Sequence, residues 1–119
     1  MSATNLAYTS FLLRVAHSGS FPEMVSALLP CYWVCMYMGK LLSRVGSPVE
    51  EYRRWIFTYG GEEYEKSVKW VINTLDRFEV TKHQGEAMLN CFRTATIYEY
   101  LFFDSAMRKE RFPFPVSPR

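Results

Sequence analysis

The sequence has few of the features that mark secreted or nucleic-acid-binding proteins. Its 119 residues include only three cysteines, an odd number, and the N-terminus MSATNLAYTS lacks a basic segment followed by an apolar one. Disulfide bonds and a secretory signal are therefore not expected. The net charge is only +2, and no basic stripe interleaved with aromatic residues occurs, which argues against a nucleic-acid partner. We expect a cytoplasmic protein.

The chain also lacks an uncharged run of the length that a membrane span requires. The longest one, residues 24–39, is shorter than the roughly 20 residues needed. It reads MVSALLPCYWVCMYMG, with a proline, two thiols and three aromatic rings. We interpret it as a buried helix and expect no membrane partner. With 49% hydrophobic and 22% charged residues, the composition is that of an ordinary globular domain.

Strand-like alternation is absent beyond four residues, whereas start and stop signals for helices recur along the chain. Two segments, Ser20-Phe-Pro-Glu23 and Thr81-Lys-His-Gln84, have the spacing of a capping box, and Ser47-Pro-Val-Glu50 repeats it. These signals predict five helices: one capped by Thr4 or Asn5 that ends at residue 18, then 21 to 44 with a kink at Pro30, 48 to 59, 62 to 78 and 82 to 109. The fold class is all-α, one helical bundle over residues 1–119 with an irregular tail at 110–119.

Apolar stripes define the expected core. The first helix carries one that includes Tyr8 and Phe11, and the fourth carries one that includes Tyr64 and Val68. Both tyrosines are interpreted here as core positions.

Two thiols, Cys31 and Cys35, lie four residues apart in the apolar helix and therefore project from one face. Adjacent helical turns hold their Cβ atoms too far apart for a good disulfide, and no nearby histidine pair completes a zinc site. The thiols are either small core side chains or part of a reaction pocket. We expect no metal and no cofactor.

Glu99 lies in RTATIYEYLFFDSAM, where its helical neighbours include Phe92, Ala95 and Phe102. A carboxylate on such a face must be paired, protonated or directed into a polar cavity. It is either a structural partner of an arginine or tyrosine, or a general acid or base. A thiol on one helix and this carboxylate on another suggest a nucleophile and a proton donor around an aromatic ligand.

Three segments in this order resemble the TenA family of thiaminase II proteins: LLPCYWVCMYMGKLL, YRRWIFTYGGEEYEKSV and TATIYEYLFFDSAM. The resemblance covers residues 6–107 and corresponds to the C-terminal half of a usual family member. It implies the haem-oxygenase-like all-α fold, of which this chain would form half. It also implies a role in thiamine salvage, in which an aminopyrimidine or thiamine itself is hydrolysed.

The resemblance also implies roles for individual residues. Cys31 matches the nucleophile that attacks the pyrimidine ring, and Glu99 matches the carboxylate that binds the aminopyrimidine and shuttles protons. The implied substrate-binding positions are Tyr59, Tyr32, Cys35 and Phe103. The apolar run would then form the wall of a dry pocket.

Several positions depart from the family pattern. Cys35 stands where the family usually has a tyrosine, and Phe103 stands where it has a tryptophan. Nothing replaces the aspartate and aromatic residues that the family's N-terminal half supplies. The alternative interpretation is a non-catalytic homo-oligomer that kept the scaffold. In either case we expect association, as at least a dimer or with a missing N-terminal half, because a half bundle exposes an apolar face.

Overall fold

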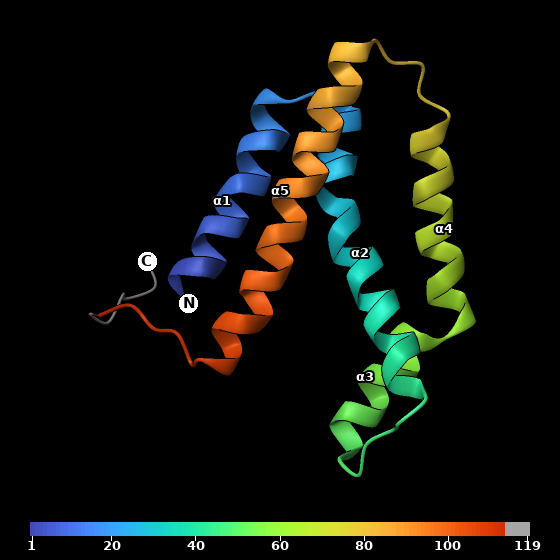
Figure 1. The fold of residues 1–119 in the computed structure, drawn as a ribbon, viewed down its shortest axis with the longest axis vertical. Helices are drawn as coiled ribbons and strands as arrows, with labels where there is room; N and C mark the ends of the chain where they lie inside the picture. The colour runs from blue at the N-terminus through green and yellow to red at the C-terminus, as the bar shows by residue number, and fades with distance from the viewer. Residues whose placement is uncertain (114–119) are drawn as a thin grey trace.

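The computed structural model describes residues 1–113, and this part of the chain forms five helices and no strand (Figure 1). The all-α prediction is therefore confirmed. The helices are α1 (Ala3–Ser18), α2 (Phe21–Ser43), α3 (Glu50–Gly60), α4 (Glu62–Asp76) and α5 (Lys82–Met107). Residues 110–113 are irregular, as expected, and the rest of the predicted tail lies outside the described residues.

The helix ends agree with the sequence signals at two of three predicted capping boxes. Ser20 with Glu23 starts α2, and Thr81 with Gln84 starts α5, each with both reciprocal hydrogen bonds. The predicted cap of α1, Thr4 or Asn5, was wrong by two or three residues, because the Ser2 hydroxyl accepts a hydrogen bond from the Asn5 amide and caps the helix there. An oxygen at this position satisfies an amide that has no partner within the helix.

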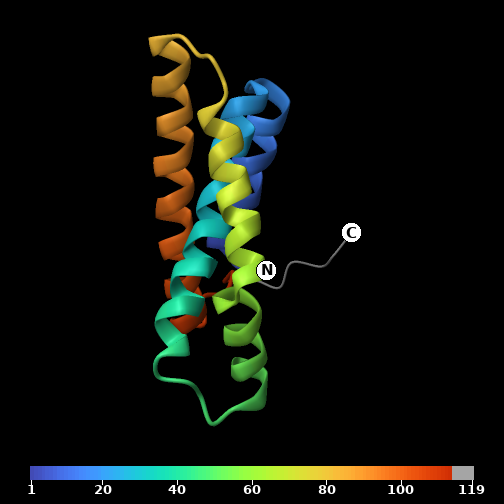
Figure 2. The same ribbon diagram turned by 90° about the vertical axis from the view of Figure 1, so that its right-hand side faces the viewer.

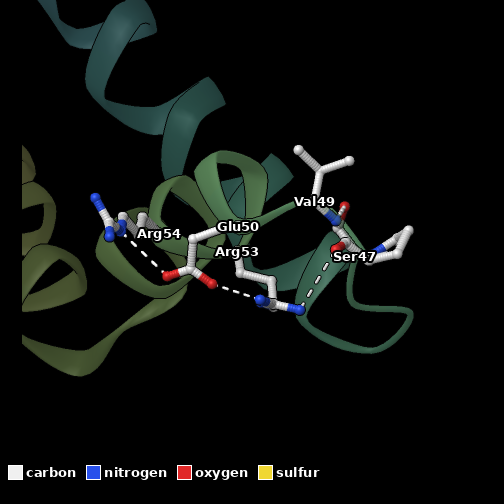
Figure 3. A network of polar contacts seen from close by, with 6 residues as sticks. Ser47, Val49, Glu50, Arg53 and Arg54 are labelled. Carbon is white, nitrogen blue, oxygen red and sulfur yellow. Dashed lines mark hydrogen bonds and ion pairs between the residues drawn. The ribbon is translucent and has the colours of Figure 1, made fainter.

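The predicted capping box at the start of α3 is not formed. Val49 occupies the cap position, and the Ser47 hydroxyl accepts a hydrogen bond from the Val49 amide instead. This end of α3 instead carries two ion pairs between side chains: the Glu50 carboxylate contacts both Arg53 and Arg54 (Figure 3). A carboxylate in the first turn of a helix is also favoured by the helix dipole.

Helix α2 is the centre of the bundle, and it contacts each of the other four helices. It continues through Pro30 without interruption. Helix α2 has 23 residues, and a window of 18 of them has a mean hydropathy of 1.3, so it is long and apolar enough to cross a membrane, a property that core helices of bundles share. The two views show α1 and α5 beside its N-terminal half, while α3 lies beside its C-terminal end (Figures 1 and 2).

The contact between α2 and α3 depends on two glycines. A Cβ atom on Gly39 would lie 2.5 Å from the Gly60 nitrogen and 2.5 Å from the Tyr59 carbonyl carbon. No side chain fits at that distance, so glycine allows the two backbones to touch. The contact fixes the position of Tyr59 at the end of α3.

Helix α4 is held less tightly, because among the described residues it contacts only α2 and α3. An ion pair joins it to α2: the Lys40 ammonium lies 2.6 Å from the Glu65 carboxylate. This lysine and Lys69 lower the pKa of Glu65 to about 2. The largest buried cluster lies at the other side of the molecule, between α1, α2 and α5, and includes Phe11, Val15 and Ala95.

Candidate active site

The strongest polar contact inside the bundle joins α1 to α5. The Tyr8 hydroxyl donates a hydrogen bond of 2.6 Å to Glu99 Oε1, and both side chains are buried. This length is typical of a hydroxyl bonded to a charged oxygen. Burial, followed by the hydrogen bond to Glu99, raises the pKa of Tyr8 well above its ordinary value. Of the two alternatives for Glu99, a structural partner or a general acid or base, the hydrogen bond to a tyrosine is therefore present. This bond also holds the carboxylate in one position.

The thiols of Cys31 and Cys35 lie next to this pair. The Cys35 thiol, burial and the Glu99 carboxylate all raise the pKa of Cys31. The Cys31 thiol in turn lowers the pKa of Cys35, against the effect of burial. Three of the predicted site residues, from α2 and α5, are thus brought together.

The prediction that Cys31 lies in a dry pocket was wrong for this chain. Cys31 is exposed to solvent, and Cys35 is half-buried. The thiol face of α2 is open because none of the five helices covers it fully. An uncovered thiol remains in contact with water, whereas the chemistry of a dry site depends on excluding it.

Two tyrosines on α3 and α4 extend the site. Tyr59 and Tyr64 pack edge to face, with ring centroids 4.8 Å apart. Burial and then the charges of Cys35 and Cys31 raise the pKa of Tyr64, which places this ring within the electrostatic reach of the thiols. The predicted residue Tyr59 is therefore part of the same neighbourhood, through Tyr64.

An open pocket of about 520 Å³ lies between α2 and α4, and its wall includes Tyr64, the ring whose pKa the thiols help to raise. Tyr32 lines it from α2, and Tyr64, Ser67, Val68 and Trp70 are among the residues that line it from α4. Its volume falls within the range of small-molecule sites, roughly 300–1,000 Å³. The predicted residue Tyr32 thus lies on a pocket wall.

Phe103 is the predicted residue that neither lines this pocket nor packs against the Tyr59–Tyr64 pair. Its ring packs against Phe102, with centroids 5.7 Å apart, and it is partly exposed. Conversely, Tyr8 and Tyr64 belong to the site although their apolar stripes predicted only core roles. The signal that could have identified them is the hydroxyl, because a buried tyrosine usually finds a polar partner. No cluster of three or more metal-binding side chains occurs within residues 1–113.

The comparison with known proteins identifies the family of the chain. The model of the TENA/THI-4/PQQC family matches residues 1–109. The chain is 38% identical to an aminopyrimidine aminohydrolase of Bacillus subtilis (strain 168), over 92% of this chain and 47% of the relative. It is 35% identical to the aminopyrimidine aminohydrolase of Helicobacter pylori, over 86% of this chain and 49% of the relative.

A third relative with that name, from Halalkalibacterium halodurans, is 31% identical over 88% of this chain and 49% of its own length. The chain therefore spans about half the length of the curated relatives that it matches. That it corresponds to their C-terminal half stays a prediction. The family match extends over nearly the whole sequence, and on this basis the chain belongs to the TENA/THI-4/PQQC family.

Proposed function

We propose that this chain carries the reacting groups of a thiaminase II-type hydrolase that acts on an aminopyrimidine or on thiamine. The observation that carries the proposal is the grouping of Cys31, Glu99 and Tyr8 from three different helices. The aminopyrimidine aminohydrolases among its relatives support the same substrate class. Cys31 would be the nucleophile and Glu99 the acid and base, with Tyr8 as a positioning residue.

The reaction starts with addition of the Cys31 sulfur to an electron-poor carbon of the pyrimidine ring, while the thiol proton passes to Glu99. The electron pair released into the ring then expels the amine from the neighbouring aminomethyl carbon, and Glu99 returns the proton to the leaving nitrogen. Water adds to the exposed methylene carbon and gives a proton to Glu99, which passes it to the cysteine sulfur as the ring expels it. The net change replaces the amine by a hydroxyl, and the thiol is regenerated.

Because the pKa of Cys31 is raised, Glu99 must act as the base that removes the thiol proton. At neutral pH the sulfur is protonated, because the Cys35 thiol, the partial desolvation that remains on this exposed helix face and the nearby carboxylate all raise the pKa of Cys31. Attack therefore requires removal of the proton in the same step, and a neighbouring carboxylate provides this base. The short bond from Tyr8 keeps Glu99 oriented toward the thiol while it accepts and returns the proton.

The test is hydrolysis of the aminomethyl-pyrimidine and of thiamine by the purified chain, followed by product chromatography. Cys31→Ser should reduce turnover to background, and Glu99→Gln should lower it by about 10²–10⁴-fold. Cys91→Ser is the matched control, because this thiol is buried in the α1–α2–α5 cluster and takes no part in the proposed chemistry. Equal turnover by the Cys31 variant would refute the assignment of the nucleophile.

The second candidate is a non-catalytic oligomer with the same scaffold. The exposed thiol and the cysteine at position 35 favour it, because a site whose parts act as a unit loses activity steeply when one part is absent. Isothermal titration with the pyrimidine separates the two functions. The hydrolase must bind this ligand, whereas the scaffold alone has no need of it.

A further inference from the structure

The outward surface of α4 forms one continuous face, and all its residues except the half-buried Thr74 are exposed in the described part of the chain. We call it the α4 face, and it consists of Glu63, Lys66, Ser67, Trp70, Asn73, Thr74 and Arg77. These positions recur every three or four residues, on the side opposite the buried residue Val68. Trp70 lies at the middle of the face and is 65% exposed.

The amount of exposed surface indicates that the chain has a partner. The chain exposes 8963 Å², whereas a folded monomer of 14.0 kDa exposes roughly 6,700 Å². Six fully extended residues would account for at most about 1,000 Å² of this difference. More than about 1,000 Å² of additional surface therefore belongs to residues 1–113, and a stable interface needs only about 800 Å² from each partner.

The charges on the α4 face match those of a second copy of itself. Glu63 lies seven residues before Trp70, and Arg77 lies seven residues after it. Arg77 continues the helix with φ −85° and ψ −13°, so it stays in register with the face. If two copies of α4 pair antiparallel about a two-fold axis through Trp70, Glu63 of each copy meets Arg77 of the other. Such self-complementarity is what a symmetric dimer requires.

Both charged residues are available for this contact. Glu63 is 94% exposed and has a single weak ion pair, at 3.4 Å to Lys66. Arg77 makes no ion pair with any residue in the described part of the chain. The two ends of the paired helices would therefore gain opposite charges without breaking an established contact within the chain.

The same face reaches the candidate active site. Four of its members, Glu63, Lys66, Ser67 and Trp70, also line the pocket between α2 and α4 that Tyr32 and Tyr64 share. We infer that a second copy of this chain packs on the α4 face and closes the outer side of this pocket with its own Trp70. This inference rests on the proposed function only in naming the pocket as the substrate site. Since each relative is about twice as long, two copies also restore the mass of one relative.

The mass in solution tests the inference without any substrate. Analytical ultracentrifugation over a range of protein concentrations should give a dimer of about twice 14.0 kDa. Trp70→Ala should raise the dimer Kd by at least about 30-fold, as expected for a central tryptophan. Tyr100→Ala is the matched control, because this ring is 71% exposed on α5, away from the α4 face, and it should leave the dimer Kd unchanged.

Charge reversal tests the register. Glu63→Arg alone and Arg77→Glu alone each place like charges opposite one another, so each should weaken the dimer. The double variant exchanges the charges and should restore it, while circular dichroism confirms that all three variants fold. A monomer at every concentration, loss of the dimer in Tyr100→Ala but not in Trp70→Ala, or no recovery in the double variant would overturn the inference. A dimer without hydrolysis would refute only the proposed function, and hydrolysis by a monomer would refute only the dimer.

Discussion

Replacing Gly39 by alanine should destabilise the protein, although alanine is the better helix former. The added Cβ would lie 2.5 Å from backbone atoms of Tyr59 and Gly60, and a backbone cannot move aside as a flexible side chain can. Overpacking of this kind costs about 1–3 kcal/mol, and we take the upper end because both contacts are to backbone. Alanine recovers about 1 kcal/mol of helix propensity. The net loss is then about 2 kcal/mol.

For a domain of this size, that loss corresponds to a fall in Tm of roughly 6–12 °C. Urea denaturation followed by circular dichroism measures the free energy of unfolding, and thermal scans measure the Tm. Gly85→Ala is the control, because a Cβ there would meet only a Val80 methyl at 3.9 Å. That substitution should stabilise the protein by up to about 1 kcal/mol. If Gly39→Ala were as stable as the wild type, the close contact between α2 and α3 would be refuted.

Two further predictions concern the site. Tyr8→Phe removes the hydroxyl that donates a hydrogen bond to the buried Glu99 carboxylate. This substitution should lower the free energy of unfolding by about 1.5–3 kcal/mol in urea titrations. Tyr98→Phe, in the ring stacked on Tyr8, is the control, and an equal loss there would contradict a specific role for the hydrogen bond. Cys35→Ala removes the largest cause of the raised pKa of Cys31. Alkylation of Cys31, followed by peptide mass spectrometry from pH 6 to 10, should therefore begin at lower pH in this variant; an unchanged profile would count against the coupling of the two thiols.

The parts of the fold that depend on local signals could be predicted from the sequence. Ser20 with Glu23 and Thr81 with Gln84 start helices where expected, because a capping box involves four neighbouring residues and needs no tertiary contact. The third box failed at Ser47, where the hydroxyl accepts from an amide two residues on and a turn results. Serine side chains satisfy nearby amides in either way, and spacing alone does not decide between them.

The site was harder to predict, because its residues meet through long-range contacts. Tyr8 and Glu99 are 91 positions apart, and the apolar pattern around Tyr8 predicts a core residue equally well. Motif resemblance identified Cys31 and Glu99 but could not report exposure. The solvent exposure of a thiol depends on which other segments pack over it, and the sequence of the helix that carries the thiol does not show this.

The structure divides the proposed site into two parts with different physical support. Cys31, Glu99 and Tyr8 are held by contacts within the chain, since α1 and α5 both pack on α2. The pocket wall on α4 is held by few contacts and lies open to solvent. Binding energy for a ring such as a pyrimidine comes from enclosing surfaces, whereas bond making depends on the placement of the reacting groups. A chain with the reacting groups in place and an incomplete enclosure should therefore lose affinity for its substrate before it loses the geometry of its chemistry.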